Sequence, residues 1–201
     1  MLVAIVDYGV GNLRSLEKAF QRVGADCVIT NVEKELAESD AIALPGVGAF
    51  RDAMKNLEPL SQFIIDFVKE GKPLLGVCLG MQLLFGESTE DGLHRGLNIV
   101  KGRVVRLPSS VKIPHIGWNT LTFDRENPLF EGVPDNPYVY FVHSYYLVPE
   151  NQSVTVAWTE YGVRFSSVIH DKSVYATQFH PEKSGSVGLK ILENFVKYCR
   201  V

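Results

Sequence analysis

Short apolar runs alternate with amphipathic stretches through the first half of the chain. Residues 2–6 form a compact run typical of a strand, and residues 12–23 carry apolar positions at helical spacing before Gly24. The alternation continues with strand patterns at 27–30, 41–44 and 74–77 and helical patterns at 60–70 and 79–85. Because strands alternate with helices, the pattern predicts a parallel sheet with helices on both faces.

The second half is instead rich in β-type runs. They occupy residues 103–107, 120–123, 138–148, 154–158, 168–169 and 175–179, with Pro, Asn, Asp and Gly between them. Residues 188–198 form a closing amphipathic helix. The predicted fold class is therefore α/β, an open and mostly parallel sheet flanked by helices with an additional antiparallel β portion. Since no repeat or long linker divides the chain, we expect a single domain over residues 1–201.

Composition and charge narrow the classes of function. The 201 residues are 46% hydrophobic and 21% charged, which is ordinary for a globular protein. A net charge of −3 gives no broad electrostatic reason to expect a nucleic-acid or membrane partner. The first residues lack the basic region and cleavage site of a signal peptide, and no apolar run reaches the length of a membrane span.

The cysteines and histidines are too scattered to suggest a disulfide framework or a metal site. Cys27, Cys78 and Cys199 form no CxxC pair, and the five histidines include no close pair. We therefore expect a reduced, cytoplasmic protein without a bound metal.

Cys78 stands in a Gly76-Val77-Cys78-Leu79-Gly80 pattern between a predicted strand and a predicted helix. This is the thiol counterpart of the G-x-S-x-G nucleophile elbow, in which a strained turn raises the nucleophile above the carboxyl edge of the sheet. A sulfur at a helix N-terminus is favoured as thiolate, and the backbone N–H of Leu79 can face an oxyanion. The alternative is a buried core cysteine after a strand.

A thiol nucleophile needs a base, and the base needs a group that orients it. His180 and Glu182 are two residues apart, so on an extended chain both would project from the same face. The carboxylate could then steady the imidazole while the other ring nitrogen faces Cys78. The alternative is an exposed His and Glu at the end of a strand.

The other histidines suit the role of base less well. His143 lies in an apolar strand pattern, where a hydrogen-bonded or pocket-lining side chain is expected. His115 stands among loop-forming residues and is expected at a surface site. His94 and His170 lie in polar segments that we expect to be exposed loops.

Two glycine-rich segments follow predicted strands. Residues 45–50 would form a loop at the carboxyl end of the sheet, where ligands bind in open α/β folds. Backbone amides there could complete an oxyanion hole, although a plain turn is the alternative. Residues 9–12 lack the third glycine of a dinucleotide-binding loop because position 14 is Arg14, so nucleotide binding is not predicted.

Two motifs together carry a resemblance to a known family. GVCLGMQ at 76–82 and QFHPEKS at 178–184 resemble the class I, triad-type glutamine amidotransferases. The resemblance implies a class I glutamine amidotransferase-like fold and a catalytic triad of Cys78, His180 and Glu182. It also implies an oxyanion loop and a glutamine-binding site built from Gly46, Val47, Gly48, Leu79, Gln82, His143, Ser144 and Tyr145.

Further motifs favour one subfamily. DYGVGNLRSL (7–16), PHIGWN (114–119), YFVHSYY (140–146) and HPEKSG (180–185) are similar to the glutaminase subunits of imidazole glycerol phosphate synthase, and the likeness covers essentially the whole chain. It implies glutamine as substrate, no cofactor, and a heterodimer with a (β/α)8-barrel cyclase that receives the ammonia in histidine biosynthesis. Positions near the partner interface and ammonia exit would be Trp118, Asn119, Tyr140 and Lys183, although the aromatic rings could instead pack internally.

Three other functions compete with this one. The chain could be the glutaminase subunit of another synthase, of the anthranilate or aminodeoxychorismate type. A cysteine peptidase would share Cys78 and His180 but would leave Gln82 and the HSYY segment unexplained. A non-enzymatic α/β module with a redox-sensitive Cys78 would not need His180.

Overall fold

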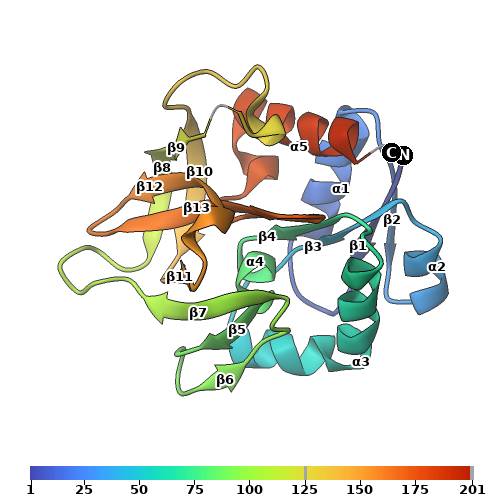
Figure 1. Cartoon of the computed structure of the whole chain (residues 1–201), viewed down its shortest axis with the longest axis horizontal. Helices are drawn as coiled ribbons and strands as arrows, with labels where there is room; N and C mark the ends of the chain where they lie inside the picture. Colours follow the sequence, from blue (N-terminus) through green and yellow to red (C-terminus); the bar gives the residue numbers. More distant parts are fainter. Residues whose placement is uncertain (125, 200–201) are drawn as a thin grey trace.

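A computed structural model describes residues 1–124 and 126–199. Within them, a twelve-stranded mixed sheet forms the centre of the molecule, and a sheet of two strands lies beside it (Figure 1). The single domain that we predict over residues 1–201 also includes Arg125, Arg200 and Val201, which lie outside the described residues. The domain assignment stays a prediction.

The first half of the chain supplies most of the parallel strands. They are β1 (Leu2–Val6), β2 (Asp26–Thr30), β3 (Ala41–Leu44) and β4 (Leu74–Val77), in the order β2-β1-β3-β4. A late strand, β14 (Val174–Thr177), pairs with β4 in parallel. β3, β4 and β14 are buried along their whole length, as expected for parallel strands that are covered on both faces.

Helices cover both faces of these strands, as predicted. α1 (Leu13–Arg22) and α5 (Gly185–Tyr198) pack on one face, while α3 (Phe50–Lys69) and α4 (Leu79–Leu83) pack on the other (Figure 1). The short α2 (Glu33–Ala37) buries Leu36 against the α3 side. The core therefore consists of two apolar clusters, one on each face of the sheet.

A mostly antiparallel portion extends the same sheet beyond β14. Its strands are β5 (Phe85–Ser88), β6 (His94–Arg95), β7 (Val100–Arg106), β9 (Thr122–Phe123), β11 (Tyr145–Pro149), β12 (Thr155–Glu160) and β13 (Arg164–Asp171). The separate small sheet pairs β8 (His115–Thr120) with β10 (Tyr138–His143) in antiparallel fashion. Three 3-10 turns complete the fold: η1 (Pro128–Phe130), η2 (Gln152–Val154) and η3 (Pro181–Lys183).

The predicted fold class is confirmed, but several predicted boundaries are wrong. The helix expected at 60–70 begins at Phe50, since its apolar face continues past Pro59. The run at 138–148 is two strands that lie in different sheets. The run at 120–123 likewise divides between β8 and β9, and α2 has no counterpart among the predictions.

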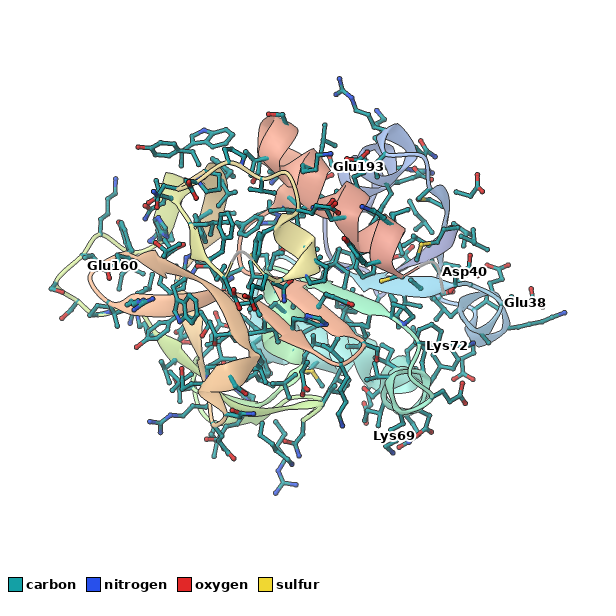
Figure 2. All side chains as sticks on the ribbon, turned by 45° about the horizontal axis from the view of Figure 1, so that its top comes forward. Glu38, Asp40, Lys69, Lys72, Glu160 and Glu193 are labelled. Atoms are coloured by element: carbon teal, nitrogen blue, oxygen red, sulfur yellow. The ribbon has the colours of Figure 1, made fainter. Side chains whose placement is uncertain are left out.

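Many charged side chains lie at the periphery, where water solvates them. Figure 2 shows Glu38 and Lys69 beside α2 and α3, with Glu160 at the opposite edge. In the part of the chain that the structure describes, no helix is both long and apolar enough to cross a membrane.

Candidate functional site

Cys78 occupies a strained elbow between β4 and α4. Its backbone has φ 55° and ψ −110°, a conformation that non-glycine residues rarely adopt. The N–H of Cys78 donates to the carbonyl of Thr177 at 2.7 Å, which ties the elbow to the end of β14. The predicted strand-to-helix elbow is therefore confirmed.

The glycines of the elbow are required by close packing. A Cβ at Gly80 would lie 1.8 Å from the carbonyl oxygen of Leu44, and one at Gly76 would lie 3.0 Å from the backbone of Met81. No side chain fits at the first distance without moving backbone. Gly80 thus lets α4 approach the end of β3, where the 45–50 loop begins.

His180 and Glu182 form a buried pair next to the elbow. His180 Nδ1 lies 2.8 Å from Glu182 Oε1, and both side chains are 3% exposed. The predicted contact is present, but the predicted reason is wrong. Pro181–Lys183 is a 3-10 turn rather than extended chain, so Glu182 folds back onto the ring. Pro181 favours this turn because its fixed φ suits a first helical position.

The surroundings favour the charged form of His180. Burial of the ring opposes protonation, but hydrogen bonding and charge from Cys78 and Glu182 outweigh it and raise the His180 pKa to about 9. Nε2 makes no hydrogen bond of normal geometry with a described residue, so the contact with the sulfur is loose. Catalytic hydrogen bonds of this kind often shorten only when substrate is bound.

A pocket of about 210 Å³ opens over Cys78. It brings together nearly all of the residues that the resemblance places at a glutamine site, namely Val47, Gly48, Leu79, Gln82, His143, Ser144 and Tyr145. Gly46 is not in the wall; it is buried beneath the loop, where a Cβ would lie 2.6 Å from Tyr8 Oη. Three further residues line the pocket that the sequence did not predict there: Glu90, Pro114 and Val142.

Glu90 brings a carboxylate to this pocket. Its Oε2 accepts a hydrogen bond from the N–H of Phe50 at 2.6 Å, at the start of α3. Glu90 stands in an otherwise polar turn, and no local sequence signal distinguishes it from a solvated surface residue. Only the folded chain shows that it lines the same pocket as Cys78.

His143 and His115 form a buried pair on the inner face of β8 and β10. Burial lowers the pKa of His143 to about 3 and that of His115 to about 4, so both rings are neutral. His143 Nδ1 contacts the carbonyl of Tyr145 at 2.9 Å and therefore carries the proton, so Nε2 accepts from His115 Nδ1 at 3.0 Å. The prediction of a hydrogen-bonded, pocket-lining His143 is confirmed.

The predictions for the other histidines are wrong. His115 is 3% exposed and lies in β8, stacked on Tyr161, because Gly117 and its neighbours form a strand rather than a loop. His94 lies in β6, and His170 lies in β13, where it stacks on Tyr175 with ring centroids 4.3 Å apart. Both are half-buried because strand pairing places them there.

The residues expected near a partner interface do not all lie on the same face of the two-stranded sheet. Trp118 is 55% exposed on the outer face of β8 and lies beside Tyr140, with ring centroids 5.9 Å apart. Asn119 points to the inner face, where Nδ2 donates to the carbonyl of Glu160 at 3.0 Å. Lys183 is exposed on η3, next to the His180–Glu182 pair. The aromatic pair therefore does not pack internally.

The remaining cysteines lie away from this site. Burial raises the pKa of Cys27 to about 11 and that of Cys199 to about 12, so both are thiols near neutral pH. Among residues 1–124 and 126–199, no group of His, Cys, Asp or Glu side chains is arranged to hold a metal ion.

A cysteine beside a buried histidine that is oriented by a carboxylate can accept an acyl group, which defines a class of thiol-dependent acyl-transfer enzymes. The family model for glutamine amidotransferase class-I matches residues 4–199. The chain therefore belongs to the class-I glutamine amidotransferase family.

Relatives within this family indicate a narrower group. The imidazole glycerol phosphate synthase subunit HisH of Aquifex aeolicus is 54% identical over 198 residues, which cover 97% of this chain and 96% of that protein. The HisH subunit of Methanothermobacter thermautotrophicus is 50% identical over 200 residues, which cover 99% of this chain and all of that protein, 100%.

Solved structures share the fold at much lower identity. The structure of PurLQS from Thermotoga maritima matches with a TM-score of 0.78 at 19% identity and covers 98% of both chains. A crystal structure of a glutamine amidotransferase from Thermotoga maritima matches with a TM-score of 0.67 at 18% identity, covering 98% of this chain and 83% of that one. These likenesses concern the fold alone.

Proposed function

We propose that this chain is the glutaminase subunit of imidazole glycerol phosphate synthase, with Cys78, His180 and Glu182 as its catalytic triad. The observation that carries the triad is the buried His180–Glu182 pair beside the strained Cys78, with a His180 pKa raised to about 9. The near full-length identity to HisH subunits supports the choice of synthase.

The reaction is acyl transfer from an amide to a thiol and then to water. The proton of Cys78 Sγ moves to His180 Nε2, and the thiolate attacks the side-chain carbonyl carbon of glutamine. His180 then donates that proton to the departing ammonia, leaving a thioester. In the second half, His180 takes a proton from water, which attacks the thioester and releases glutamate. Glu182 holds the ring in position throughout.

The tetrahedral oxyanion needs hydrogen-bond donors that are already in place. The N–H of Leu79 lies at the start of α4, and the 46–48 loop follows β3 at the same edge of the sheet. One such donor can contribute about 3 kcal/mol to transition-state stabilisation. The positive φ of Gly48, 100°, and the free space around it leave this segment able to present its amides to the pocket.

The pocket wall suits the charged groups of an amino acid. Glu90 offers a carboxylate to the α-ammonium group, and Ser144 stands between β10 and β11, where its N–H can face the α-carboxylate. Gln82 presents its amide from α4, next to Cys78. These contacts would hold glutamine with its side-chain amide at the sulfur.

The partner surface is the outer face of the two-stranded sheet. Ile116, Trp118 and Tyr138 are 59%, 55% and 62% exposed there, and together they form an apolar patch of the kind that marks interaction sites. Free ammonia is readily protonated in water, so its production should be coupled to its use. A (β/α)8-barrel cyclase docked on this patch, in a cytoplasmic heterodimer, would receive it directly and form imidazole glycerol phosphate and aminoimidazole-carboxamide ribonucleotide.

The decisive experiment measures glutamine hydrolysis with and without the cyclase and its nucleotide substrate. Cys78→Ala should lower kcat by at least about 10⁴-fold. Cys27→Ala, a matched change at a cysteine outside the pocket, should leave kcat unchanged. Activity that survives in Cys78→Ala would contradict the triad. Stimulation by an anthranilate or aminodeoxychorismate partner, but not by the cyclase, would favour the alternative synthase.

A further inference from the structure

Gln178 is a buried polar residue next to Cys78 that the proposed mechanism does not use. Its side chain is 0% exposed, and its Nε2 lies 3.8 Å from Cys78 Sγ, within hydrogen-bonding range of a sulfur acceptor. The position follows from the register of the sheet. Thr177 pairs with Val77 in the parallel β14–β4 ladder, so residues 178 and 78 leave that ladder side by side.

The orientation of the Gln178 amide is determined by its neighbours. A backbone carbonyl can only accept, so the Gln82 group that lies 3.0 Å from the Tyr145 carbonyl is the NH2. The same NH2 lies 3.1 Å from Gln178, and the atom that meets it must therefore be the Gln178 oxygen. This leaves the Gln178 NH2 directed at the sulfur.

The sulfur consequently has partners for both of its protonation states. The carbonyl of Val142, 3.6 Å from Sγ, can accept a hydrogen bond from the thiol but would repel a thiolate. The Gln178 N–H can donate to a thiolate, and hydrogen bonds to charged groups are stronger than those to neutral ones. Because Cys78 is 5% exposed, few water molecules can replace this donor.

We infer that Gln178 is a catalytic residue whose side-chain N–H stabilises the Cys78 thiolate. The inference rests on the proposed role of Cys78 as nucleophile. The proton still moves from Cys78 Sγ to His180 Nε2; Gln178 donates a hydrogen bond and transfers no proton. Gln82 and the Tyr145 carbonyl act as positioning groups, since they fix which end of the Gln178 amide faces the sulfur.

The test measures thiolate formation directly, without glutamine. The full chain is alkylated with iodoacetamide at a series of pH values, and modification of Cys78 is followed by peptide mass spectrometry. Cys27 and Cys199, with pKa values raised to about 11 and about 12, react little in this range and serve as internal references. The variants are Gln178→Met, which removes the donor at similar size, and Gln178→Glu, which replaces the NH2 by a carboxylate oxygen.

Gln178→Met should lower the alkylation rate of Cys78 near neutral pH about tenfold. Gln178→Glu should lower this rate further because a carboxylate repels the thiolate. Gln152→Met is the matched control, since Gln152 donates to the Pro149 carbonyl three residues earlier and does not line the pocket over Cys78, and it should behave as the wild type.

A Cys78 alkylation profile that is unchanged in either folded Gln178 variant would overturn the inference. If Gln178→Met does not fold, Gln178→Glu and Gln82→Met, which frees the Gln178 amide to rotate, provide the same readout. If the wild-type chain fails to hydrolyse glutamine but Cys78 is still alkylated more slowly in Gln178→Met than in wild type, the proposed function fails while this inference stands.

Discussion

The central parallel strands and the two-stranded β8–β10 sheet both contribute to the pocket, but they are built differently. β3 and β4 bury every side chain between two helical layers, and Cys78 stands at the end of β4. β8 and β10 bury one face and expose the other, with Trp118 outward and His115 inward. Two strands alone are marginally stable, so this sheet depends on what packs against each face.

Because they are built differently, the two regions contribute to the pocket in different ways. The parallel strands hold the proposed nucleophile, Cys78, at an elbow where Gly80 packs too closely for any side chain. The two-stranded sheet provides the opposite wall of the pocket through Val142 and His143 and leaves an apolar face outward. A partner that covered that face would therefore touch the same strands that form the pocket wall.

The largest expected effect is in the parallel region. Gly80→Ala should lower the free energy of unfolding by more than about 4 kcal/mol, because its Cβ would lie 1.8 Å from the Leu44 carbonyl. Gly71→Ala, at a positive φ with open space around it, should cost only about 1–2 kcal/mol. Denaturant titration measures both. Equal losses in the two variants would show that the elbow is less tightly packed than this distance implies.

Glu182→Gln should affect catalysis more than stability. The change keeps the size of the side chain but removes the charge that helps to raise the His180 pKa to about 9. We expect kcat for glutamine hydrolysis to fall about 10²-fold or more. Steady-state kinetics with the partner present measure it, and Glu193→Gln on the surface of α5 is the matched control. A kcat close to that of wild type would remove Glu182 from the triad.

Trp118→Ala should weaken partner binding while leaving the fold intact. Truncation of a central interface aromatic typically costs about 2 kcal/mol, or roughly a 30-fold rise in Kd for the cyclase. Because the ring is 55% exposed, the melting temperature should change little. Leu93→Ala, at a side chain that is 70% exposed elsewhere, should change neither quantity. Calorimetric titration with the cyclase measures this Kd. An unchanged Kd would exclude this face as the interface.

The buried histidine pair should produce a smaller, pH-dependent effect. His115 and His143 have folded-state pKa values near 4 and 3, below the 6.5 of the unfolded chain. Their contribution to stability is complete above pH 6.5 and is lost as pH falls toward 4, by up to about 1.4 kcal/mol per pH unit for each ring.

The measurement is denaturant unfolding between pH 7.5 and 4.5, compared for wild type and His115→Phe. In the variant, the slope of the free energy of unfolding against pH should be smaller by about the contribution of one titrating ring. Tyr161→Phe, which keeps the ring that stacks on His115, should retain the full slope. Parallel curves for wild type and His115→Phe would show that the ring titrates normally in the folded state.

The parallel region was predictable because its signals are local. β1 and β3 are continuous apolar runs, and the elbow is encoded by five consecutive residues, Gly76 to Gly80. The long α3 was only half found, since Pro59 interrupts a pattern whose apolar face continues on both sides. Local pattern therefore gave the order of the elements more reliably than their ends.

The far wall of the pocket could not be predicted in the same way. His115 stands near Pro114 and Gly117, which favour loops, yet pairing with β10 more than twenty residues away makes it a buried strand residue. Gln178 gains its position from a parallel partner one hundred residues earlier. Glu182 was correctly placed beside His180 through an incorrect reason, because a turn and an extended chain both bring the two side chains together.

The strained backbone of Cys78 lowers the stability of the fold, although the proposed catalysis needs a cysteine at this position. A non-glycine residue held at φ 55° and ψ −110° costs on the order of 1–3 kcal/mol, which glycine would largely avoid. The fold therefore carries the proposed nucleophile at the expense of its own stability, and under the proposed function selection for activity maintains it. In a lineage freed from that selection, replacement of Cys78 by glycine would be favoured, and an inactive but more thermostable protein would result.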